Sequence, residues 1–235
     1  MVKTTIYNLS EITSDMIYIE FEPNFNSTLT NLPSSIVEIK FGNNFNQEVN
    51  NLPPNLEILT FGNCFNKEVN NLPSTLRTIK FGNSFNKTLD YLPESMEFLE
   101  IGDNFNLPIA NLPKSLKYLK IGSNFNQDVN SLPSSLESLC LGYNFNSPII
   151  NFPSNLKELE IKNYAYSYDN IEFMEKIKMH GIKFLNIKHN YFGLKGCTGP
   201  IGATGPNGVT GSNGYIPQQI IAYGWTGKII KYAYI

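Results

Sequence analysis

A Phe-Asn pair recurs every 20 residues through the first 150 residues of the chain. The phenylalanines of these pairs are Phe25, Phe45, Phe65, Phe85, Phe105, Phe125 and Phe145. A Leu-Pro pair, replaced in the last copy by Phe-Pro, follows each of them seven residues later, and a glycine recurs with the same period from Gly42 to Gly142. Seven copies without an insertion or deletion indicate a repeat architecture in which each unit stacks on the next.

The repeating unit is too short to hold a strand, a full helix and two turns. It contains one stretch of alternating apolar residues, such as Leu59-Thr60-Phe61, and this period predicts a strand with one buried face. We therefore predict a β-rich solenoid whose 20-residue coils stack their strands into one parallel sheet, about 4.8 Å apart. The eight expected strands end at Phe21, Phe41, Phe61, Phe81, Ile101, Ile121, Leu141 and Ile161.

The unit resembles the FNIP repeat, a variant of the leucine-rich repeat found mainly in social amoebae and in giant DNA viruses of amoebae. The motif is closest at Phe105-Asn106-Leu107-Pro108-Ile109 and at Asn146-Ser147-Pro148-Ile149, whereas other units replace the proline, for example by Glu48. The resemblance covers residues 12–162. It implies a leucine-rich-repeat-like solenoid and no shared catalytic residues, so no active site is transferred to this chain.

An asparagine follows each phenylalanine of the repeat. These residues are Asn26, Asn46, Asn66, Asn86, Asn106, Asn126 and Asn146. An amide side chain both donates and accepts hydrogen bonds, so a stacked column of them can bond the turn backbone of neighbouring coils. The alternative roles are ligand binding or glycosylation, for which Asn26-Ser27-Thr28 is an acceptor sequence. We interpret the column as structural.

Charged residues of alternating sign occupy one position of the predicted strand region. From the third coil onward they are Glu57, Arg77, Glu97, Lys117, Glu137 and Lys157. In a parallel sheet each charge then has neighbours of opposite sign, and a slip by one coil places like charges together. We interpret this column as a device for register and solubility. The alternative, carboxylates paired for acid–base chemistry, is disfavoured because nearly every Glu has a basic neighbour.

The next position along the coil holds Ile58, Phe98 and Tyr118 in three of the repeats. Its direction is open by one residue from the sequence alone. If it faces solvent, the three side chains form an apolar stripe of the kind that marks a partner site. The alternative is that the aromatic rings only pack along the sheet.

Both ends of a stacked array need caps, because the terminal coils expose apolar residues. We expect residues 1–21 to form an imperfect first coil and residues 163–190 to form a closing helix and strand, within a solenoid of residues 1–190. Asp169-Asn170-Ile171-Glu172 resembles a capping box, and Gly181 lies where the helix should end. The alternation at Lys183-Phe184-Leu185-Asn186-Ile187 predicts a ninth strand.

Beyond the solenoid the pattern changes to a glycine at every third position, from Gly193 to Gly214. This Gly-X-Y spacing over residues 191–216 resembles collagen, in which only glycine fits at the axis of the triple helix. It predicts an extended tail in a monomer, or a homotrimer joined through residues 193–214. Residues 217–235 form an apolar, aromatic C-terminal tail.

Composition excludes several classes of function. A net charge of −2 gives no basis for binding nucleic acid or an anionic membrane. Two His and three Cys give no metal-site spacing, and no nucleophile–base set, phosphate loop or cofactor motif is present. No apolar run of about 18 residues and no signal-peptide h-region occur, which favours the host cytoplasm or a virion.

We therefore predict a non-catalytic scaffold that binds a protein partner whose identity the sequence does not give. The alternative is a structural role, in which the Gly-X-Y segment makes the chain a trimeric component of a particle or fibre.

Overall fold

The computed structural model describes residues 5–163, 166 and 171–185. Contacts divide the chain into two units, Met1–His189 and Asn190–Ile235, and all elements described below belong to the first. Its strands are β1 (Thr5–Ile6), β2 (Tyr18–Phe21), β3 (Glu38–Lys40), β4 (Ile58–Thr60), β5 (Thr78–Lys80), β6 (Phe98–Ile101), β7 (Tyr118–Ile121), β8 (Ser138–Leu141), β9 (Glu158–Ile161) and β10 (Lys183–Leu185). A 3-10 helix, η1 (Leu9–Glu11), and one α-helix, α1 (Ile171–Met179), complete the described structure.

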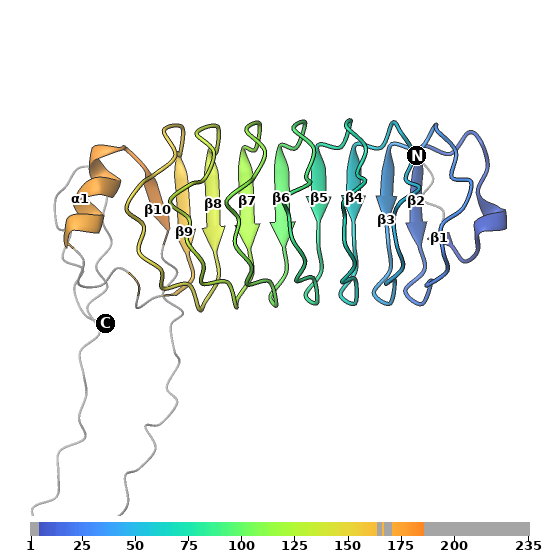
Figure 1. The fold of residues 1–235 in the computed structure, drawn as a ribbon, viewed down its shortest axis with the longest axis horizontal. Coiled ribbons are helices and arrows are strands. Elements are labelled where there is room, and N and C mark those ends of the chain that lie inside the picture. Colours follow the sequence, from blue (N-terminus) through green and yellow to red (C-terminus); the bar gives the residue numbers. More distant parts are fainter. Residues whose placement is uncertain (1–4, 164–165, 167–170, 186–235) are drawn as a thin grey trace, which may run out of the picture. The chain divides into compact units, whose positions relative to one another are not determined.

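The ten strands form one parallel sheet in chain order, as Figure 1 shows. From β2 to β9 each strand pairs with the next at an offset of 20 residues, as in the pairing of Ile39 with Leu59. The predicted solenoid and its eight strands are therefore confirmed. The predicted closing strand is β10, whereas β1 was not expected as a strand, because two residues show no alternation; Ile6 pairs with Phe21 at a shorter offset.

Stacked phenylalanines form the centre of the solenoid. The Phe of each Phe-Asn pair from Phe45 to Phe145 is completely buried, and neighbouring rings of this column lie 6.0–6.2 Å apart. A second column, closer to the sheet, consists of Phe21, Phe41, Phe61 and Phe81 with a spacing of 5.2–5.5 Å. No coil could bury these rings alone, so the stacking of identical coils supplies the hydrophobic core.

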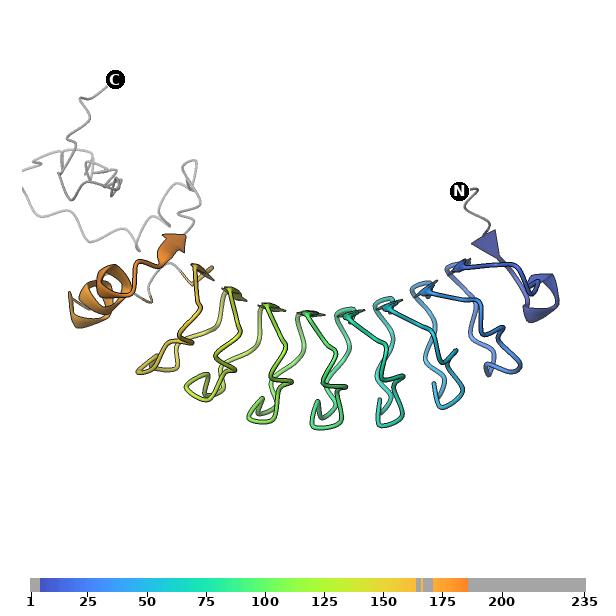
Figure 2. The same cartoon turned by 90° about the horizontal axis from the view of Figure 1, so that it is seen from above.

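The solenoid curves, and the sheet lies on its concave side (Figure 2). The spacing between aromatic rings of neighbouring coils increases away from the concave side. On the solvent-facing side of the sheet the ring centroids of Phe98 and Tyr118 are 4.2 Å apart, whereas those of Phe125 and Phe145 in the core are 6.2 Å apart. Neighbouring coils are thus closest at the sheet, where hydrogen bonds set the strand separation, and fan apart on the side of the aromatic core.

The recurring glycine is required by the close approach of successive coils. A Cβ atom on Gly62 would lie 2.2 Å from the carbonyl oxygen of Gly42, and the other glycines of the column show similar distances to the preceding coil. The recurring glycines serve this close approach and not a positive φ, since only Gly181 has a positive φ among the described glycines. The recurring Pro begins a turn into the strand, in which the Ile36 N–H donates to the Pro33 carbonyl.

The C-terminal cap closes the core with α1 and β10. Phe173 and Ile177 of α1 are buried, and the ring of Phe173 contacts those of Phe152 and Phe184. The helix ends before Gly181, whose φ of 63° is the left-handed conformation expected at a helix C-terminus. The predicted capping residues at 169–170, the end of the predicted closing strand, the Gly-X-Y segment and the apolar tail lie outside the described residues.

Candidate functional site: the concave face of the sheet

We define the concave face as the outward side chains of β2–β10 together with the residue that precedes each of β3–β9. In each of β3–β9 the second residue is buried, and the residues on either side of it are less buried, except in β8, where Cys140 is buried as well. Leu99 and Leu119 are fully buried, so Phe98 and Tyr118 point outward and are half-buried. This resolves the one-residue uncertainty that the sequence left open: the predicted stripe faces solvent.

Phe98 and Tyr118 form a stacked pair at the middle of this face. Their ring centroids are 4.2 Å apart and their planes differ by 3°, and the Lys80 ammonium lies 5.1 Å from the centre of the Phe98 ring. Burial raises the pKa of the Tyr118 hydroxyl. Ile58 lies on the same face but is separated from Phe98 by Thr78. The structure therefore brings two of the three predicted site residues into contact and leaves the third two strands away, with β5 between them.

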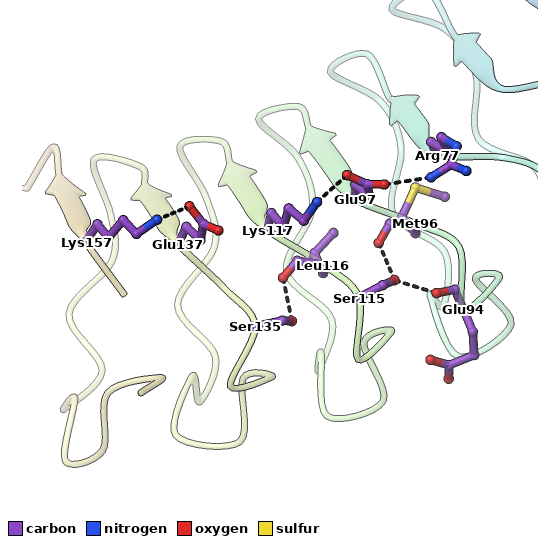
Figure 3. Close-up of polar contacts among 10 residues, drawn as sticks. All are labelled: Arg77, Glu94, Met96, Glu97, Ser115, Leu116, Lys117, Ser135, Glu137 and Lys157. Carbon is purple, nitrogen blue, oxygen red and sulfur yellow. Dashed lines mark hydrogen bonds and ion pairs between the residues drawn. The ribbon is translucent and has the colours of Figure 1, made fainter. Parts of the chain in front are cut away.

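The column of alternating charges occupies the position before this pair in each coil, and Figure 3 shows it from Arg77 to Lys157. The Glu97 carboxylate forms ion pairs with both Arg77 and Lys117, each with an N–O distance of 2.7 Å. The Lys157 ammonium lies 2.6 Å from the Glu137 carboxylate. Hydrogen bonds from Lys117 and Arg77 hold the pKa of the Glu97 carboxyl below its usual value. Within the described residues no ion pair joins Glu57 to Arg77 or Lys117 to Glu137, so the column is paired in blocks rather than continuously.

A second column of charged residues on this face contains Lys40, Lys80, Glu100, Lys120 and Glu160. Its main hydrogen-bond acceptor is Glu100. Lys120 lies 2.5 Å and Lys80 lies 3.6 Å from its two carboxylate oxygens. The hydrogen bond that the Lys120 ammonium donates to Glu100 raises the pKa of Lys120.

The asparagine column is a ladder of hydrogen bonds from coil to coil. The side-chain oxygen of each Asn accepts from the backbone N–H of the Asn one coil later, at 2.7–3.1 Å for all six steps from Asn26 to Asn146. Several side chains of the ladder are exposed, so its role does not depend on burial. Each coil thereby satisfies a turn N–H that has no strand partner.

A column of hydroxyl side chains, which the sequence analysis missed, bonds the backbone just before the strands begin. The Ser135 hydroxyl donates to the Leu116 carbonyl at 2.8 Å, and Ser115 donates in the same way to Met96 at 2.7 Å (Figure 3). Ser35, Thr75 and Ser95 repeat this contact. The sequence does carry a signal for this column, because a polar residue lies two positions after each recurring Pro. The signal is visible only when the repeats are compared with one another.

A hollow of about 520 Å³ lies beside the C-terminal coils. It is lined by Glu137, Ser154, Asn155, Leu156, Lys157, His180 and Gly181. Its Glu and Lys pair with each other, and the His180 Nδ1 lies 2.8 Å from the Lys176 carbonyl oxygen. His189, the other histidine of the predicted cap, lies outside the described residues.

Neither a metal site nor a membrane-spanning helix is found in the part of the chain that the structure describes. No group of three or more His, Cys, Asp or Glu side chains is arranged to hold a metal ion. No helix in the same residues has the length and apolarity to cross a bilayer.

Comparison with known proteins gives matches for the repeat region. The FNIP Repeat pattern matches residues 25–64, 45–84, 85–124 and 125–164. No curated protein matches the chain. The crystal structure of CroV588, described as a novel circular LRR protein structure, is 33% identical over 62% of this chain, with a TM-score of 0.47. The similar region spans 30% of the CroV588 chain.

Proposed function

Because the chain belongs to the FNIP repeat family, we propose that it is a non-catalytic scaffold whose concave face binds another protein. The observation that carries this proposal is the stacked, outward-facing pair of Phe98 and Tyr118 at the middle of a curved sheet. Aromatic side chains at the centre of a contact commonly supply most of its binding energy, and stacked repeats offer extended concave surfaces for such contacts.

The surroundings of the aromatic pair fit the anatomy of a protein interface. Two columns of ion-paired side chains flank the pair on either side, in positions that would form a polar rim. Their charges alternate in sign, which is unsuited to the uniform negative charge of nucleic acid or of an anionic membrane. A protein partner is therefore the class that we propose. We propose the host cytoplasm or a virion as its place of action, the location that the sequence favours.

The proposal is tested by affinity capture with the full chain as bait. The variant I58D/F98D/Y118D places three carboxylates on the concave face. A matched control, Y91D/I150D/M179D, makes the same kind of change at exposed apolar residues outside that face. We expect the quantity of specific captured protein to fall at least tenfold for the first variant, as for the loss of a binding hot spot, and to stay unchanged for the second.

Circular dichroism of both variants must first show an unchanged fold. Equal capture by the wild type and the concave-face variant would refute the proposal, since charges at the centre of a buried contact cannot be neutral in effect.

A second candidate function rests on the eight glycines spaced by three from Gly193 to Gly214. Through residues 193–214 the chain would form a homotrimer, as a structural component of a particle or fibre. Sedimentation equilibrium distinguishes the two states, because a trimer has a mass of about 80 kDa, three times the 26.5 kDa of the chain. If sedimentation gives the mass of a single chain both with and without oxidant, this second function is excluded. The first function would not be affected by that result.

A further inference from the structure

The concave face carries seven cationic side chains, and every one of them is ion-paired with a carboxylate of the same face. The pairs are Lys40–Glu20, Arg77–Glu97, Lys117–Glu97, Lys80–Glu100, Lys120–Glu100, Lys157–Glu137 and Lys183–Glu158. Since Glu97 and Glu100 each take two cations, three carboxylates of the face, Glu38, Glu57 and Glu160, have no cationic partner among the described residues. The contact of Glu160 with Cys140 is to a neutral thiol, at 3.2 Å.

These three carboxylates lie on both sides of the aromatic pair. Glu38 is on β3 and Glu57 directly precedes β4, whereas Glu160 is on β9. The aromatic pair lies between them, on β6 and β7. Around the pair itself, four cations share two carboxylates. The face is therefore negative toward both ends and has a positive excess at its centre.

The following inference rests on the proposed function. We propose that the ligand of the concave face is an extended segment of a partner protein, with an apolar side chain at its centre and a Lys or Arg at each end. The central side chain stacks on Phe98 and Tyr118. The terminal cations meet Glu57 at one end and Glu160 at the other, and the positive excess at the centre selects against a basic residue there.

The strand spacing fixes the length of this segment. The coils of Glu57 and Glu160 are five strand spacings apart, which is about 24 Å at about 4.8 Å per strand. An extended chain covers this distance in about seven residues at about 3.3 Å each. The basic residues should therefore be separated by about seven positions, with the apolar residue midway between them.

The test uses three synthetic probes against the full chain: acetyl-Lys-Ser-Ser-Ser-Phe-Ser-Ser-Lys-amide, the same peptide with Glu at both ends, and the same peptide with Ser at both ends. Binding is followed by amide chemical-shift changes during titration. We expect the Lys-ended probe to bind at least tenfold more tightly than the Glu-ended probe, with the difference shrinking as salt is raised. The largest shifts should occur on β6 and β7.

Single substitutions then locate the charges. E57Q and E160Q should each weaken the Lys-ended probe by about two- to fivefold, as expected for one exposed ion pair. The control E48Q removes the same charge from an exposed residue outside the concave face and should change nothing. Equal binding of the Lys-ended and Ser-ended probes, or equal effects of E48Q and E160Q, would overturn the basic-ended segment. If that result occurs while I58D/F98D/Y118D still loses capture of a partner protein, the scaffold function stands and only its proposed partner chemistry fails.

Discussion

Replacing Gly102 by alanine tests whether the glycine column sets the spacing of the coils. The new Cβ would lie 2.4 Å from the Gly82 oxygen and 2.5 Å from its carbonyl carbon, whereas ordinary contact begins near 3.4 Å. The two coils must therefore separate locally by about 1 Å. The hydrogen bond from the Asn104 N–H to the Asn83 oxygen, now 2.9 Å, would stretch beyond hydrogen-bonding range.

We expect this substitution to lower the free energy of unfolding by about 3 kcal/mol, the upper part of the range for overpacking an ordered interior. The cost is steric, because Gly102 does not have the positive φ that alanine resists. A matched control lies in the same chain: a Cβ on Gly181 meets nothing within 4 Å, so G181A should cost only about 1 kcal/mol, from its left-handed backbone.

Urea unfolding followed by circular dichroism and by tyrosine fluorescence measures both variants. Repeat arrays can unfold in parts, so agreement between the two probes must precede any comparison of free energies. If G102A is no more destabilised than G181A, the coils are not held at the separation described here, and the steric explanation of the glycine column is wrong.

Three further changes test the ladder, the charge column and the cysteines. N106A removes the oxygen that accepts from the Asn126 N–H at 2.9 Å, so unfolding in urea should show a loss of about 1 kcal/mol, and an unchanged midpoint would show that water replaces this bond. The pKa of Glu97 is lowered in the folded state, so its contribution to stability is present above the unfolded pKa and is lost as pH falls through the folded pKa. The E97Q variant should therefore lose less stability than the wild type between pH 7 and pH 3. Equal losses of stability in the two proteins would contradict this. Burial raises the pKa of the Cys140 thiol to about 12, whereas Cys64 is exposed, so iodoacetamide at pH 8 should alkylate Cys64 far sooner in peptide mass analysis, and equal rates would exclude a buried Cys140.

The sequence was sufficient for the fold of the repeats because one strong period fixed the whole register. Phe45 can stack on Phe65 only if every coil has the same length, and the observed offset of 20 residues follows directly. The ends were harder to predict. Thr5–Ile6 is too short to show a period, and its pairing with β2 comes from covering the first coil rather than from its own pattern.

The candidate site was only partly predictable, since its geometry depends on differences between repeats. The sequence placed Ile58, Phe98 and Tyr118 in one column but could not tell its direction, because the charged residues before and after it also read as exposed positions. Burial of Leu99 and Leu119 decides the direction. Which carboxylates lack a cation could not be read either: sign alternation implied that Glu57 pairs with Arg77, yet the Arg77 guanidinium pairs with Glu97.

The division of roles among the positions of one coil supports placing the proposed binding function on the concave face. The Phe, Gly and Asn positions contact their equivalents in neighbouring coils, and the hydroxyl, where present, donates to a backbone carbonyl of the preceding coil, so a change at any of these positions disturbs the stacking of coils. The outward strand positions contribute less to the stacking, because their backbone groups are already paired in the sheet and their side chains make mainly exposed ion pairs across coils. These positions can therefore vary from coil to coil at a smaller cost to the stacking. A ligand-selective change that maps instead to the phenylalanine or glycine columns, with stability unaltered, would show that the binding surface lies elsewhere.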